Sequence, residues 1–171
     1  MDCNWKKTSL ADISEKIDYG FTASATDKNT GTKFLRITDI QNGFVQWRDV
    51  PFCEIDSSSK SKYLLSDGDI VVARTGNSTG ENYLFQGESF AVFASYLIRF
   101  RVNKQIVDPS YVWRCMRSSS WWNFVRGSKT GSAQAGANAK VLGRFEFEYP
   151  PLHEQKAIAE IFRTIDKKIE L

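Results

Sequence analysis

The alternating run at residues 90–102, FAVFASYLIRFRV, constrains the fold more than any other stretch of this sequence. Every second residue from Phe90 to Val102 is apolar, whereas Arg99 and Arg101 fall on the opposite face. A period of two residues is the pattern of a β-strand with one buried face. Because a run of 13 residues is long for a single strand, we also expect a bend or bulge inside it.

Other segments predict the strands that would pair with this one. Residues 70–73, IVVA, follow an Asp-Gly-Asp turn and form an uninterrupted apolar run, which predicts a buried strand. Residues 33–40 and 44–50 flank an Asn-Gly pair, a strong signal for a β-hairpin. The alternating stretch FEFEY at 145–149 predicts one further strand.

Two helices are predicted within the body of the chain. Ser9 precedes LADISEKID and has an acidic residue three positions later, which predicts a capped short helix that ends before Gly20. Asp108 as N-cap, Pro109 at the first helical position and Gly127 at the far end predict a single helix of about eighteen residues. Its apolar residues, tryptophans included, cover more than one face, so we expect it to pack deeply against the sheet.

The segment 150–171, PPLHEQKAIAEIFRTIDKKIEL, predicts a last, amphipathic helix. A Pro-Pro pair at its start resists a close return and directs the helix away from the body. We therefore favour an external partner for its apolar stripe, a second copy of the same helix being the simplest candidate, over a helix that lies back on its own domain. The stripe follows coiled-coil spacing and consists of Ile158, Ile161, Phe162, Ile165 and Ile169.

Basic charge is concentrated in one stretch of the chain. The net charge is only +3, yet residues 109–145 hold six Lys or Arg and no carboxylate. Two polar loops rich in glycine, 71–80 and 127–134, add side chains whose geometry suits base edges, and their glycines allow a backbone to approach phosphate. A polyanion such as DNA is the expected partner. The alternative is a solvated basic face without a ligand.

Catalytic and metal-binding patterns are weak. His153 is the only histidine, and the three cysteines are widely spaced without a C-x-x-C pair, which supports neither a disulfide framework nor a zinc site. The glycine-rich loops do not match a phosphate-binding loop. No stretch approaches 18 consecutive apolar residues, so we expect a cytoplasmic protein. Two rival functions stay open: a stand-alone DNA nuclease or methyltransferase, and a helix-mediated protein interaction scaffold.

The sequence resembles the specificity (S) subunits of type I restriction-modification systems. The resemblance is carried by the P-P-L-x-E-Q entry into the last helix at 150–155, and by FLRITDIQNG at 34–43 and LLSDGDIVVARTGNSTG at 64–80. It implies an α+β fold: a target recognition domain over residues 1–150 with a twisted, mostly antiparallel sheet and packed helices. A protruding spacer or dimerisation helix of coiled-coil type over 151–171 would follow.

The resemblance further implies DNA recognition without catalysis. In this family each recognition domain reads one half of a bipartite DNA sequence, and the helices pack antiparallel as a spacer between the halves. Methyltransferase (M) subunits dock on this framework and restriction (R) subunits join through them. S-adenosylmethionine, ATP and magnesium are therefore expected only in those partners. A full S subunit has two recognition domains and this sequence has room for one, which leaves a dimerising half-subunit or a fragment of a longer chain.

These considerations define a set of candidate DNA-binding residues in the basic stretch and in the two loops. Phosphate contacts are expected from Arg114, Arg117, Lys129 and Lys140. Base contacts are expected from the loop residues Arg74, Thr75, Asn77, Thr130, Ser132 and Gln134, and Ser78 is a further candidate DNA-binding residue in the first loop.

Overall fold

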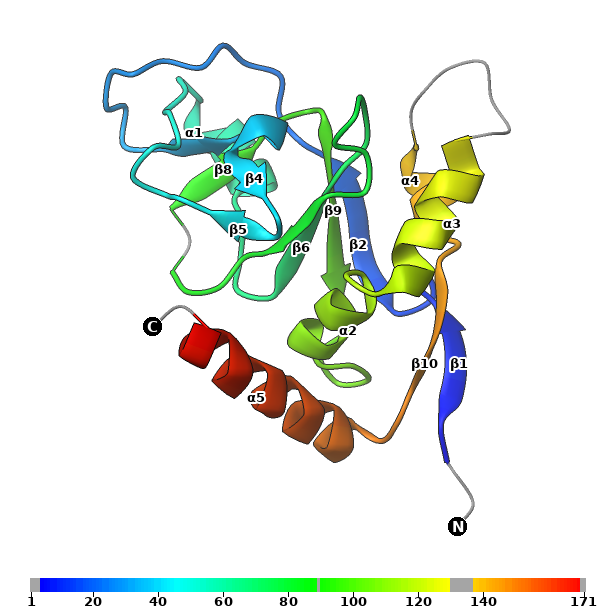
Figure 1. The fold of residues 1–171 in the computed structure, drawn as a ribbon. Coiled ribbons are helices and arrows are strands. Elements are labelled where there is room, and N and C mark those ends of the chain that lie inside the picture. Colours follow the sequence, from blue (N-terminus) through cyan, green and yellow to red (C-terminus); the bar gives the residue numbers. More distant parts are fainter. Residues whose placement is uncertain (1–3, 89, 130–136, 170–171) are drawn as a thin grey trace.

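An antiparallel sheet lies at the centre of the computed structural model, which describes residues 4–88, 90–129 and 137–169 (Figure 1). The predicted buried strand at IVVA is confirmed as the third strand of this sheet, and every residue in it is buried. In spatial order, the strands within the described residues are β2 (Ser14–Tyr19), β9 (Leu97–Val102), β6 (Asp69–Ala73) and β7 (Asn82–Leu84).

Three two-stranded sheets surround the central one in the described part of the chain. Two are antiparallel, β1 (Lys6–Ser9) with β10 (Glu146–Tyr149) and β4 (Ile40–Gln41) with β5 (Phe44–Val45). The third pairs β3 (Lys33–Leu35) with β8 (Ala91–Phe93) in parallel. The helical segments are η1 (Ile37–Asp39), α1 (Ser57–Tyr63), α2 (Pro109–Cys115), α3 (Ser119–Lys129), α4 (Ala139–Leu142) and α5 (Leu152–Ile169).

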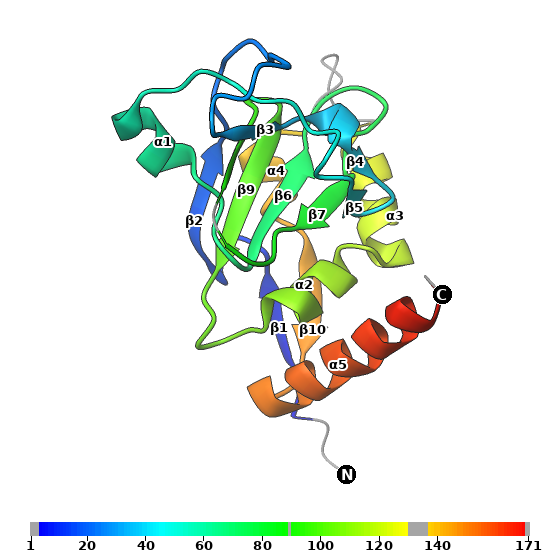
Figure 2. The ribbon, with the colours of Figure 1, turned by 90° about the vertical axis from the view of Figure 1, so that its left-hand side faces the viewer.

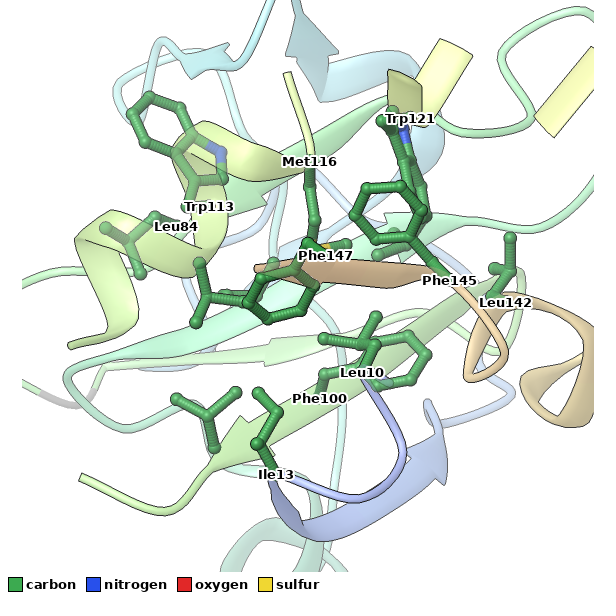
Figure 3. Packing of buried hydrophobic residues seen from close by; sticks show 14 of the residues in the cluster. Leu10, Ile13, Leu84, Phe100, Trp113, Met116, Trp121, Leu142, Phe145 and Phe147 are labelled. Atoms are coloured by element: carbon green, nitrogen blue, oxygen red, sulfur yellow. The ribbon is translucent and has the colours of Figure 1, made fainter. Parts of the chain in front are cut away.

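Strand β6 is buried on both faces, which explains why residues 70–73 are apolar without interruption. Ile70 and Val72 point into a core formed with α2, α3 and β10, where Trp121 and Phe145 pack edge to face (Figure 3). Val71 and Ala73 point into a second core on the opposite side. The aromatic residues of the 108–127 region therefore serve mainly as core, as expected, with Trp121 fully buried.

The predicted helix after Ser9 is wrong. Its capping contact does form, because the Asp12 amide donates to Ser9 Oγ at 3.2 Å and that hydroxyl donates to the Asp12 carboxylate at 2.7 Å. The contact closes a single turn rather than a helix. Leu10 and Ile13 enter the core beyond it, and the chain continues as β2, whose pairing with β9 supplies long-range hydrogen bonds that the local cap cannot match.

The single helix predicted after Asp108 is two helices, α2 and α3. Its start is as predicted, with Pro109 first and the Asp108 carboxylate accepting the Tyr111 amide at 3.1 Å. The break follows Cys115. There the buried Asn82 side chain donates to the Met116 carbonyl at 2.8 Å, which takes this acceptor out of a helical ladder. A Ser-Ser-Ser run follows, and serine competes with helical hydrogen bonding.

The long alternating run bends, as expected. Residues 94–96 form a turn between β8 and β9, closed by the Leu97 amide donating to the Ala94 carbonyl at 2.9 Å. The turn places Tyr96 outward with 57% of its surface exposed, so the predicted single apolar face ends there. The Asn-Gly hairpin is also confirmed, since Asn42 and Gly43 both have positive φ. Its strands are two residues each, because β3 pairs with β8 instead.

The last helix, α5, lies along α2 at the end of the molecule opposite the upper loops (Figures 1 and 2). Gln155 and Ala159 are buried against the body. Ile161, Phe162 and Ile165 nevertheless remain 61%, 42% and 46% exposed. The expectation that α5 points away from the body is therefore wrong for one of its faces, which packs on α2. An external partner for the exposed part of the stripe stays a prediction. None of the described helices is long and apolar enough to cross a membrane.

Candidate nucleic-acid interface

Loops from four parts of the chain meet at the end of the central sheet that lies away from α5 (Figures 1 and 2). Strands β2 and β6 both end there, and β9 begins there. Backbone hydrogen bonds join the loops: the Arg74 amide donates to the Tyr96 carbonyl at 3.1 Å, and the Ala137 amide donates to the Arg74 carbonyl at 2.9 Å. We call this surface the loop end.

The 74–80 loop has a fixed conformation. The Gly80 amide donates to the Ala73 carbonyl at 2.9 Å, which closes the loop at its base. Gly80 has a φ of +97°, and a Cβ there would meet Trp122 and Val125 of α3 at 3.0–3.1 Å. Only glycine suits both constraints. The loop is therefore pressed against α3 and presents Asn77, which is exposed, at its tip.

Arg74 is held by three neighbours at the loop end. Its Nε donates to the Ser95 carbonyl at 3.1 Å. Its guanidinium carbon lies 5.0 Å from the Tyr19 ring centroid and 6.0 Å from that of Tyr96, within the range of cation–π attraction. Tyr19 is fixed in turn, because its hydroxyl accepts the Ala139 amide at 3.1 Å. Of the other predicted residues in this loop, Thr75 and Ser78 are half-buried.

The sequence pattern did not point to Tyr19 and Tyr96 as site residues. Both are exposed and flank Arg74, yet they come from β2 and from the turn before β9. Tyr96 belonged to the predicted apolar face of the long strand. A small polar residue, Ser95, interrupts the apolar run just before it and is the one local sign that a turn could expose this ring.

The basic stretch is divided between two places. Arg114 forms an ion pair with Asp166 of α5 and lies between the rings of Trp113 and Phe162, at 4.7 and 5.3 Å. Arg117 donates to the Asn42 carbonyl at 2.7 Å, and its burial lowers the pKa of its guanidinium. Both are half-buried, Arg114 against α5 and Arg117 against the β4–β5 hairpin.

The remaining candidates lie near the loop end or outside the described residues. Lys140 is exposed on α4. This helix begins shortly after Ala137, whose amide donates to the Arg74 carbonyl. Lys129 is the last residue of α3, and its side chain is not among those described. Thr130, Ser132 and Gln134 fall outside the described residues altogether. Whether any of these side chains contacts DNA stays a prediction.

Asp69 and the two described cysteines, Cys53 and Cys115, are held within the fold. Asp69 is buried and accepts hydrogen bonds from Arg101 at 2.7 and 2.8 Å. Burial raises the pKa of the Cys115 thiol to about 11, which keeps it protonated near neutral pH. Cys53 is buried too, and burial raises its pKa. Across the described ranges, no group of three or more His, Cys, Asp or Glu is placed to hold a metal ion.

The junction between the body and α5 is built around Gln155, which is fully buried. Its Oε1 accepts the Asp108 amide at 2.9 Å, and its Nε2 donates to the carbonyls of Pro150 at 2.8 Å and Ile106 at 3.3 Å. The amide thus joins α5 to the segment that starts α2. This contact gives the Gln of the P-P-L-x-E-Q pattern a physical role.

Comparison with known proteins gives a consistent result. Residues 3–171 match the family described as the type I restriction modification DNA specificity domain. Over 98% of its length, the chain is 28% identical to the putative type I restriction enzyme MjaX specificity subunit of Methanocaldococcus jannaschii, of which it covers 42%. Over 95% of its length, it is 27% identical to the type I restriction enzyme EcoKI specificity subunit of Escherichia coli, of which it covers 36%.

The fold has a similar counterpart among solved structures. The HsdS subunit from Thermoanaerobacter tengcongensis superposes with a TM-score of 0.70 over 99% of this chain, at 16% sequence identity and covering 44% of that subunit. The expected α+β architecture is therefore confirmed. The chain spans roughly two fifths of the length of each of these relatives, as the shares of 42%, 36% and 44% indicate.

Proposed function

The chain belongs to the family of type I restriction-modification DNA specificity domains, and on this basis we propose that it reads one half of a bipartite duplex DNA sequence. The loop end is the proposed reading surface. The observation that carries this assignment is the convergence there of a fixed loop, an arginine held by two exposed tyrosines and the exposed Asn77. Fixed side chains of these types suit recognition of base edges, because little conformational entropy is lost on binding.

Residues 151–171 are proposed to serve as a spacer and association helix, with residues 1–150 as the recognition domain. The exposed side chains of Ile161, Phe162 and Ile165 support this role, since a continuous apolar stripe is stabilised when a second helix covers it. The partner would be the same helix of a second copy, or the helix of a second recognition domain in a longer chain. M subunits would dock on this framework and R subunits would join through them, supplying the catalysis, S-adenosylmethionine, ATP and magnesium.

DNA binding should depend steeply on salt, because each neutralised phosphate releases a counterion and adds about 0.9 to the slope of log affinity against log salt. Lys140→Ala should reduce this slope by about one and weaken all duplexes alike. Lys156→Ala is the matched control, an equally exposed lysine on α5 far from the loop end. Fluorescence anisotropy with labelled duplexes at several salt concentrations measures both slopes. Absence of duplex binding at low salt would contradict the proposal.

Association through α5 is tested by Phe162→Asp combined with Ile165→Asp. Two charges on the exposed stripe should raise the dissociation constant for self-association about tenfold or more, since each side chain loses apolar burial and gains a desolvation cost. Thr164→Asp, an exposed polar position on the same helix, is the control and should associate like the wild type. Sedimentation velocity over micromolar concentrations gives the answer. A wild-type chain that stays monomeric throughout would rule out the homodimer while leaving the DNA-reading role intact.

A further inference from the structure

Arg74 has a geometry that specifies more than general DNA binding. We propose that it reads a guanine in the major groove, with Tyr19, Tyr96 and the Ser95 carbonyl as the groups that position it. This inference rests on the proposed DNA-reading function and deepens it by naming the base. Four observations carry it: a fixed backbone, a fixed guanidinium plane, one hydrogen-bonding edge left over, and a charge that no neighbouring carboxylate pairs with.

The backbone of Arg74 is anchored on both sides. Its amide and its carbonyl form hydrogen bonds with Tyr96 and Ala137, at 3.1 and 2.9 Å. The turn that carries Ser95 is anchored as well, because the Ser95 amide donates to the Phe21 carbonyl at 2.9 Å. The side chain therefore starts from a defined point between the 94–96 turn and Ala137. Such preorganisation reduces the entropic cost of recognition.

The guanidinium is held by a hydrogen bond from Nε and by two nearby tyrosine rings. Nε donates to the Ser95 carbonyl at 3.1 Å, which occupies this donor of the side edge. The Tyr19 and Tyr96 rings lie 5.0 and 6.0 Å from the guanidinium carbon. The end-on edge, made of the two terminal nitrogens, remains for a ligand. Two parallel N–H donors match the O6 and N7 acceptors of guanine, which only the major groove presents together.

The charge of Arg74 is not cancelled by an acid in the described part of the chain. The guanidinium groups of Arg36, Arg101 and Arg114 each form an ion pair with a carboxylate. No ion pair involving Arg74 occurs among the described residues, and its side-chain hydrogen bond goes to a neutral carbonyl. A phosphate would also accept a two-pronged contact. A phosphate accepts a lysine ammonium about as well as a guanidinium, whereas the planar fork matches the two in-plane acceptors of guanine better than an ammonium does, and this difference helps to separate the two ligands by experiment.

The test begins with selection of duplexes from a random library by the wild-type full chain. A guanine should appear at a fixed position of the selected half-site. Arg74→Ala should lose the preference at that position while keeping the others, and should bind the selected duplex about 5- to 150-fold more weakly. Arg74→Lys, which keeps the charge and loses the fork, should show nearly the same loss. Replacing that guanine by 7-deazaguanine, which lacks N7, should weaken the wild type and leave Arg74→Ala unaffected.

The positioning residues provide a second readout. Tyr96→Phe keeps the ring and should bind like the wild type, whereas Tyr96→Ala should weaken discrimination at the guanine position more than it weakens binding to unrelated duplexes. Thermal melts of each variant confirm folding. If Arg74→Lys restores binding and Arg74→Ala weakens every duplex equally, the residue is a phosphate contact and this inference fails while the proposed function stands. If the wild type selects no sequence at all, both fail.

Discussion

Arg99→Met should lower the free energy of unfolding by about 3–5 kcal/mol, because removing one partner of a buried ion pair leaves the other charge uncompensated. The Arg99 side chain is fully buried in the central sheet. It donates to both carboxylate oxygens of Asp18, at 2.8 and 2.6 Å, and to the carbonyls of Leu64 and Lys62, at 2.9 and 3.1 Å. Methionine has similar length and satisfies none of these acceptors. Urea unfolding followed by tryptophan fluorescence measures the change.

Two further variants distinguish the loss of stability caused by the missing ion pair from the loss caused by poorer packing. Arg36→Met removes the more exposed pair with Asp39 and should cost at most about 1 kcal/mol. Adding Asp18→Leu to Arg99→Met removes the carboxylate that has lost Arg99 and keeps only the more exposed Lys16 as an ion-pair partner, and should recover part of the lost stability. If the two substitutions are instead additive, the double variant will lose the sum of the stabilities lost by Arg99→Met and by Asp18→Leu. Additivity would mean that the two residues act independently, and the explanation by loss of an ion pair would be wrong.

Arg99 also shows which features of this fold can be predicted from the local sequence pattern and which cannot. The period-two run at 90–102 predicted a strand and a bend, and both are confirmed. The pattern placed Arg99 on the face opposite the apolar one. That face is a second core, and Arg99 is accommodated there because β2 and β6 bring Asp18 and Asp69 beside it. Those partners come from strands distant in the sequence, so only the sheet order reveals them.

The errors in helix prediction have the same physical origin. Ser9 and Asp12 do form the capping contact that their spacing indicates, yet pairing with β9 decides the conformation of the residues that follow. The break between α2 and α3 depends on a hydrogen bond from Asn82, thirty-four positions earlier in the chain. Local signals are worth about 1 kcal/mol each, and tertiary pairing and packing outweigh them.

The loop of the candidate site could be predicted from the sequence, whereas the residues that surround Arg74 could not. Arg74 and Asn77 follow a buried strand in a glycine-containing turn, a pattern that sequence alone can detect. Tyr19 and Tyr96 reach Arg74 only because β2, β9 and β6 are neighbours in the sheet. The basic stretch at 109–145 looked like one surface because its residues are close in sequence. In the structure Arg114 lies on α2 and Lys140 on α4, because the chain between them forms the separate helix α3.

Gln155→Leu is the second change with a large expected effect, a loss of about 2–4 kcal/mol in the free energy of unfolding. Leucine fits the apolar surroundings but leaves one buried amide and two carbonyls without their partner, and each unsatisfied buried group costs about 1–3 kcal/mol. Some of these groups can regain water, which keeps the total below the simple sum. Lys156→Leu, the adjacent exposed position, should change stability by no more than about 0.5 kcal/mol.

Hydrogen exchange distinguishes a local from a global consequence of the Gln155 substitution. Gln155 joins the first turn of α5 to the residues around Asp108, so its loss should raise amide exchange in α5 and at the start of α2 before the central sheet is affected. Uniform protection loss across the sheet would show that Gln155 supports the whole domain instead. If the local result holds, the direction in which α5 leaves the body is set by one buried amide.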